Sequence, residues 1–163
     1  MSKKVACGGL LLSINIILLL LINVIPINTL FLMGLASLPI SIVIMEWGPK
    51  SGFAFYIASV VLGFIVMANK THWIIYILTF GIYGIVKYII EQDRLIYIEY
   101  LLKILFANMI MILLYFLLRP FVYIPINIAT VIAFEVVFIV YDHIYTTFIK
   151  NYNQKLRKII KSI

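Results

Sequence analysis

The sequence predicts an all-α membrane protein, a bundle of six helices that each cross the bilayer, on three observations. Hydrophobic residues make up 65% of the 163 positions and charged residues 12%, whereas soluble domains carry about 25% charge. The mean hydropathy is +1.16. Apolar segments recur along the whole chain, each long enough to cross a hydrocarbon core of about 30 Å at 1.5 Å per residue. Lipid is therefore the expected solvent.

Prolines, glycines and charged residues divide the apolar sequence into spans. The first decisive break is residues 46–52, where proline removes a backbone donor and glycine resists a continuing helix, so we expect a hairpin at 48–52. Pro26 is expected to end the first span and Pro39 to kink the second. The predicted spans are 5–25, 30–45, 53–68, 73–90, 98–118 and 124–149.

Basic residues predict the orientation of these spans. With the hairpin at Lys50 inside, every Lys and Arg except Lys70 and Arg119 lies at or near the inner face. Both termini are therefore expected to be cytoplasmic. The chain is predicted to form a transmembrane domain at 1–149 and a basic amphipathic tail at 150–163, in a multi-pass protein of the bacterial plasma membrane.

The net charge of +7 would point to nucleic acid in a soluble chain. Here the basic residues stand at the ends of spans, so anionic lipids of the inner leaflet are the expected partners, and no nucleic acid is expected. The single cysteine, Cys7, forms no intramolecular disulfide, and no Cys/His set has metal-ligand spacing. Without a nucleophile beside a base, or a phosphate-binding loop, we expect no enzyme and no cofactor.

Polar residues near the bilayer centre are the first candidates for function. Insertion of a carboxylate at the bilayer centre costs about 2.5–3.5 kcal/mol, so the presence of Glu135 at that depth needs an explanation. Asn15, Tyr83 and Asn108 lie at comparable depth on three other spans. Two interpretations stand. In one, this layer is the floor of a ligand cavity or part of a proton path; in the other, the asparagines hydrogen-bond a protonated Glu135 in a structural network.

A second polar group lies toward the predicted outer surface. His72, Tyr76, Thr79 and Tyr83 recur at spacings of four, three and four, which places them on one face of a regular α-helix. Such a stripe suits a flat molecule bearing heteroatoms; the alternative is an interfacial belt with ordinary helix contacts. The candidate ligand-binding residues are His72, Tyr76, Tyr83, Asn108, Arg119, Asn127 and Glu135.

Small residues predict where helices approach one another closely. They recur on one face of each of the first four spans, and intramolecular packing is the favoured interpretation over docking of another subunit. Near the inner ends, Lys87 is spaced to pair with Glu91, and Glu99 with Lys103. The small-residue faces are Ala6, Gly9 and Ser13; Gly34, Ser37 and Ser41; Gly52, Ser59 and Gly63; Gly81 and Gly84.

The layout of six spans resembles the substrate-binding S components of energy-coupling factor transporters. The residues that carry the resemblance are the run Leu38-Pro39-Ile40 and the sequence Gly-Pro-Lys-Ser-Gly at 48–52, which leads into a third helix rich in small residues. The motifs cover about 30 residues, from Leu35 to Gly63.

The resemblance implies a membrane-embedded subunit that binds a small-molecule solute, a vitamin or micronutrient, for uptake. It also implies partners: a transmembrane coupling subunit and ATPases. In that family an alanine pair four apart on the first helix contacts the coupling subunit, and Gly9 and Ser13 stand in its place here.

The alternative is a non-transporting bacterial scaffold or interaction protein, similar in size and layout to rod-shape-determining membrane subunits. Such a protein acts by binding partners. Retention of one small ligand favours the binding subunit, whereas stable co-purification with envelope proteins favours the scaffold.

Overall fold

A computed structural model describes residues 2–92, 94–121 and 127–156. Within these residues, six helices are long and apolar enough to cross a membrane, which confirms the predicted class of an all-α, multi-pass protein. They lie at Lys3–Val24, Thr29–Trp47, Pro49–Val66, Lys70–Ile90, Ile96–Leu118 and Ile128–Gln154. The predicted start of the sixth span at Ile124 and the tail positions from 157 onward lie outside the described residues.

The chain forms two compact units, Met1–Tyr123 and Ile124–Ile163. The first unit contains α1 (Ser2–Val24), a 3-10 turn (Pro26–Asn28), α2 (Thr29–Trp47), α3 (Pro49–Val66), α4 (Lys70–Ile75), α5 (Ile82–Ile90) and α6 (Ile96–Leu118). The second contains α7 (Ile128–Asn151) and a short π-helix (Tyr152–Leu156).

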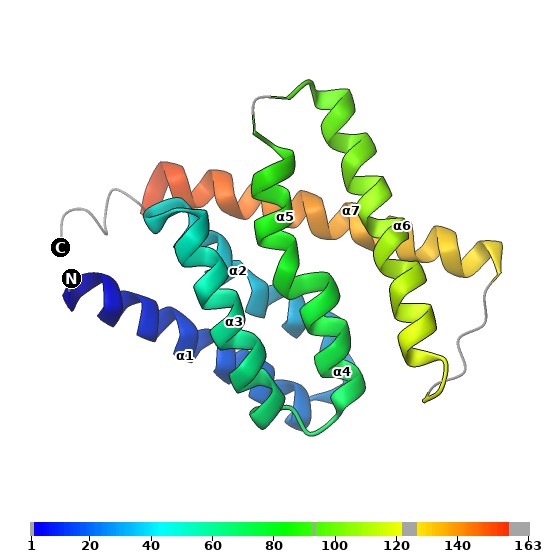
Figure 1. Ribbon diagram of the computed structural model, residues 1–163, viewed down its shortest axis with the longest axis horizontal. Coiled ribbons are helices and arrows are strands. Elements are labelled where there is room, and N and C mark those ends of the chain that lie inside the picture. The colour runs from blue at the N-terminus through cyan, green and yellow to red at the C-terminus, as the bar shows by residue number, and fades with distance from the viewer. Residues whose placement is uncertain (1, 93, 122–126, 157–163) are drawn as a thin grey trace. The chain divides into compact units, whose positions relative to one another are not determined.

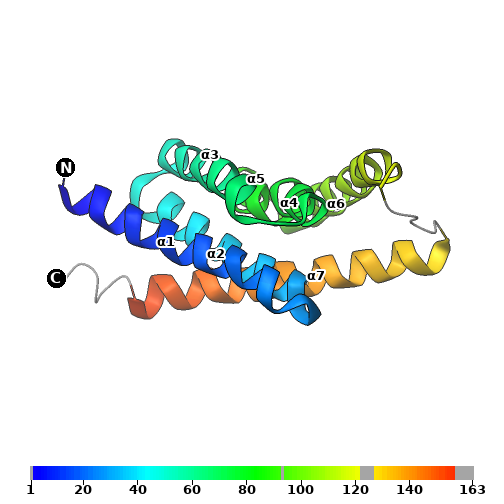
Figure 2. The same cartoon turned by 90° about the horizontal axis from the view of Figure 1, so that it is seen from below.

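The helices of the first unit lie in two layers. Figures 1 and 2 show α1 and α2 side by side in one layer and α3, the fourth span and α6 in the other. The helix α2 contacts α1, α3 and α5, and it is the most buried span of the unit. Its apolar side chains meet those of α1 and α3 in a cluster of Leu11, Ile40, Val43, Ile44 and Phe55.

The predicted hairpin at 48–52 is shorter than expected. Gly48 alone separates α2 from α3, with φ of 82° in the left-handed region that glycine tolerates. Pro49 is the first residue of α3, where a missing N–H leaves no bond unmade and the fixed φ suits a helix start. Residues 49–52 therefore belong to the first turn of α3.

The fourth span contains an irregularity that the sequence does not predict. Between α4 and α5, the six residues Tyr76–Gly81 form a π-helix, so the span from Lys70 to Ile90 is continuous but changes its winding halfway. A π turn holds one residue more than the α turn that it replaces, because its bonds run from i to i+5.

Three of the four small-residue faces are used in packing within the first unit. Ser37, Ser41, Ser59 and Gly63 are buried, and so are Gly52, Gly81 and Gly84. The face on α1 differs: Ala6, Gly9 and Ser13 are exposed, and a Cβ built on Gly9 meets nothing within 4 Å. Packing among the described residues of the first unit thus accounts for the faces on α2, α3 and the fourth span but not for the face on α1.

Candidate functional site

The polar centre of the first unit is a closed ring of three side chains. The Asn15 amide donates to the Tyr76 hydroxyl at 2.8 Å, and the Ser59 hydroxyl donates to Asn15 Oδ1 at 2.7 Å. The hydroxyls of Ser59 and Tyr76 lie 2.8 Å apart, so the Tyr76 proton completes the ring. The second proton of the Asn15 amide goes to the Ala36 carbonyl at 2.5 Å.

All three side chains of this ring are fully buried. They come from α1, α3 and the π turn, and α2 supplies the Ala36 carbonyl, so four spans meet at one polar point. Burial of unpaired amides and hydroxyls is costly in lipid, and the ring removes that cost by pairing them with one another. The polar groups of Asn15 and Tyr76 are thus used in hydrogen bonds to each other and to Ser59.

Tyr83 faces a different neighbour. It is also fully buried, and its ring centroid lies 6.0 Å from that of Phe106 on α6. Tyr76 and Tyr83, which a regular helix would align on one face, are thus directed at different elements on either side of the π turn. Thr79, between them, donates its hydroxyl to the Ile75 carbonyl.

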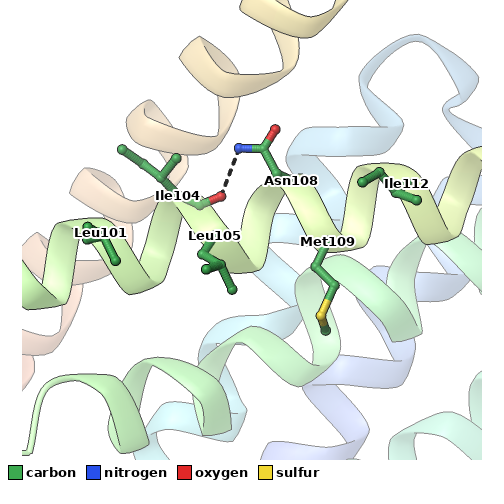
Figure 3. A pocket seen from close by; sticks show the side chains of 6 residues that line it. All are labelled: Leu101, Ile104, Leu105, Asn108, Met109 and Ile112. Atoms are coloured by element: carbon green, nitrogen blue, oxygen red, sulfur yellow. Dashed lines mark hydrogen bonds between the residues drawn. The ribbon is translucent and has the colours of Figure 1, made fainter.

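Asn108 lies on an open groove beside α6. The groove has a volume of about 610 Å³ and is lined by Leu101, Ile104, Leu105, Asn108, Met109 and Ile112, all from this helix. Asn108 is the one polar side chain among these six. Figure 3 shows its amide turned back along the helix, where it donates to the Ile104 carbonyl at 3.0 Å.

The remaining candidates lie on α4 and α7 and at the ends of α6 and α7. His72 is half-buried on α4, and Arg119 is exposed at the end of α6, with its guanidinium 5.8 Å from the Tyr115 ring centroid. Asn127 caps α7: its side-chain Oδ1 accepts from the Thr130 backbone N–H at 2.8 Å, and its backbone N–H donates to the Thr130 hydroxyl at 3.1 Å. Glu135 lies on α7, in the second unit.

Two lysines and one carboxylate form a second polar cluster at the turn between α5 and α6. The ammonium groups of Lys87 and Lys103 each donate to Glu91 Oε1 at 2.6 Å. Their side chains are 1% and 8% exposed, and that of Glu91 is 31% exposed. The predicted pair of Lys87 with Glu91 is confirmed. The spacing also predicts Glu99 as the partner of Lys103, but the structure pairs Lys103 with Glu91, across the turn.

Replacement of Glu91 by glutamine is expected to lower the free energy of unfolding by about 1–2 kcal/mol. The change removes the charge that both buried ammonium groups contact, while partial solvation of the carboxylate limits the loss. Denaturant unfolding in detergent micelles measures it. The half-buried Glu99→Gln is the control and is expected to change stability by under about 0.5 kcal/mol. Equal losses in both variants would contradict a specific role for Glu91.

Sequence reasoning named Asn15 and Tyr76 but did not place them in the same ring. Ser59 stood in a small-residue face, and its polar role had no signal of its own in the sequence. Among the residues that the structure describes, no group of three or more His, Cys, Asp or Glu side chains is arranged to hold a metal ion. No family model matches the chain, and neither does any curated protein or solved structure.

Proposed function

We propose that this multi-pass membrane protein is the solute-binding subunit of an energy-coupling factor type uptake transporter in a bacterial plasma membrane, with both termini cytoplasmic. The exposed face of Ala6, Gly9 and Ser13 on α1 is the observation that carries the proposal. The other small-residue faces serve packing within the first unit, whereas this one is exposed there, and we assign it to contact with the coupling subunit. Small residues suit such a contact because helix backbones then approach closely.

The groove beside α6 supports the solute-binding part of the proposal. Its volume is about 610 Å³, but it is open to one side and lined by α6 alone, so it would cover only part of a small molecule. Its lining is apolar apart from Asn108, and a largely apolar wall with few polar groups is typical of small-molecule sites. Asn108 belongs to the layer of candidate ligand residues that the sequence predicts.

Native mass spectrometry of the protein purified from its own membranes tests solute binding. We expect one small molecule per chain, and its loss in Asn108→Leu, which keeps the side-chain volume but removes the amide from the groove. Thr147→Ala, on the exposed side of α7, is the control and is expected to retain the molecule. Absence of any bound molecule, together with absence of a coupling subunit and ATPases from a pull-down, would contradict the proposal.

The face on α1 is tested separately by Gly9→Leu. A side chain at Gly9 meets no atom of the chain within 4 Å of its Cβ, so we expect the variant to fold and to retain the solute. We expect it to lose co-purification of the coupling subunit, because leucine holds the two backbones apart. Leu10→Ala, which changes the neighbouring exposed position, is the matched control.

The second candidate function is a membrane scaffold that binds other envelope proteins and transports nothing. The ring of Asn15, Ser59 and Tyr76 favours it, because these polar side chains are buried for contacts with one another and not directed at a solute. Stable co-purification with envelope proteins, with no retained solute, would support the scaffold.

A further inference from the structure

The π turn at Tyr76–Gly81 divides the fourth span into two halves, whose hydrogen bonds and ring contacts reach different helices. On its outer side, Trp73 donates its indole N–H to the Val60 carbonyl at 3.0 Å, and Tyr76 joins the ring with Asn15 and Ser59. On its inner side, Tyr83 packs near Phe106 of α6. Glu91, at the end of α5, bonds to Lys103 of α6. Through these side chains the outer half bonds to α1 and α3, whereas α5, the inner half, packs on α2 and α3 and also on α6.

The extra residue of the π turn accounts for this division. Seven residues of regular α-helix turn through about 700°, which would bring Tyr83 within about 20° of Tyr76. One additional residue in the turn shifts the inner half by about 100° relative to the outer half. Tyr83 therefore lies near Phe106 of α6 because the π turn is present.

Side chains hold the turn in this form. The Tyr56 hydroxyl, from α3, donates to the Ile77 carbonyl at 3.0 Å, inside the π turn. Gly81 ends the turn against the Tyr56 ring: a Cβ there would lie 3.1 Å from that ring and 3.2 Å from the Tyr76 carbonyl oxygen. Because π turns break the regular α pattern of bonding, a carbonyl such as that of Ile77 gains from a partner supplied by another helix.

We propose that the π turn is a rotational switch and that the Tyr56 hydroxyl is its latch. Conversion of Tyr76–Gly81 to regular α-helix rotates α5 by about 100° against α4 and aligns Tyr83 with Tyr76 on one face. It withdraws Tyr83 and Glu91 from α6 and turns a different face of α5 toward α2 and α3. That aligned face is the stripe that the sequence periodicity predicts. The rotation is independent of the proposed function, which bears only on what the aligned face would bind.

Distances between spin labels on α5 and α6 test the switch. Labels are placed at two exposed positions, Tyr88 and Leu101, with Cys7 replaced by serine. A rotation of about 100° moves a label held about 8 Å from the helix axis by about 12 Å. In the parent protein we expect one dominant distance, and in Tyr56→Phe we expect a second population displaced by about 10 Å.

Deletion of Thr79 distinguishes conversion of the π turn from a general loosening of the packing between α5 and its neighbours. Without the extra residue the span is regular α-helix with both halves in their present registers, so the deletion is expected to fold and to keep the parent distance. Combined with Tyr56→Phe, it is expected to abolish the second population. The matched control, Tyr115→Phe on α6, is expected to leave the distance unchanged.

Three results would overturn the proposal. A single parent distance in Tyr56→Phe would mean that the turn does not convert when the latch is removed. A second population that persists in the double variant would mean that the motion is not a π-to-α conversion. A Thr79 deletion that does not fold, or that changes the distance by itself, would mean that the extra residue does not set the register.

Discussion

Replacement of Asn15 by alanine is expected to lower the free energy of unfolding by about 2–4 kcal/mol, the largest loss for any single polar residue of the first unit. Asn15 makes three hydrogen bonds, to Tyr76, Ser59 and the Ala36 carbonyl, and its side chain is fully buried. Hydrogen bonds between membrane helices are worth about 0.6–2 kcal/mol each. Alanine removes all three at once and leaves a cavity.

The measurement is denaturant unfolding in detergent micelles, followed by tryptophan fluorescence. Ser13→Ala is the matched control on the same helix, because the Ser13 hydroxyl bonds to the Gly9 carbonyl one turn away and its side chain is exposed. Ser13→Ala is expected to change stability by under about 0.5 kcal/mol. If Asn15→Ala were as mild as Ser13→Ala, the ring would not be what joins α1, α3 and the fourth span.

Enlargement of Gly52 is expected to have the second large effect, a loss of about 1–3 kcal/mol for Gly52→Ala. A Cβ at this position would lie 2.2 Å from Ile44 Cγ1, and Ile44 is itself 4% exposed in the cluster between α1, α2 and α3. The clash falls next to the single-residue connection at Gly48, where the two helices have least room to separate.

A size-swap variant distinguishes this clash from a general intolerance of substitution. Ile44→Ala removes the atom that the new methyl group meets, so Gly52→Ala should cost less in the Ile44→Ala background than in the parent chain. Gly9→Ala is the second control: with no atom within 4 Å of its Cβ, it is expected to be neutral, or to stabilise by up to about 1 kcal/mol. A cost for Gly52→Ala that is unchanged by Ile44→Ala would refute the contact as its cause.

The sequence predicted the spans well because burial in lipid imposes one requirement on every residue of a span. Prolines and glycines then placed the breaks to within a few residues. The errors fell at helix starts: Pro49 was assigned to a loop, although a proline at the first helical position loses no hydrogen bond. For the same reason, the start of α3 moved from Phe53 to Pro49.

The candidate site was predicted less completely, since depth in the membrane does not specify which side chains meet. Asn15 and Asn108 were assigned to one layer, yet Asn15 bonds to Ser59 and Tyr76, while Asn108 lines the groove beside α6. The α-helical period placed Tyr76 and Tyr83 on one face. The π turn between them invalidated that period, and no local composition distinguishes a π turn from an α turn.

The sequence by itself determined the class of protein, the number of helices able to cross a membrane and most of their limits, because apolar length and chain breaks are local properties. Only the tertiary structure decided that Asn15, Ser59 and Tyr76 close a ring, that Lys103 pairs with Glu91, and that a π turn separates the face of Tyr76 from that of Tyr83. Those outcomes depend on the relative rotation of helices. The rotation of each helix about its axis is set by packing and, in the fourth span, by a single extra residue in one turn. Hydropathy predicts neither of these.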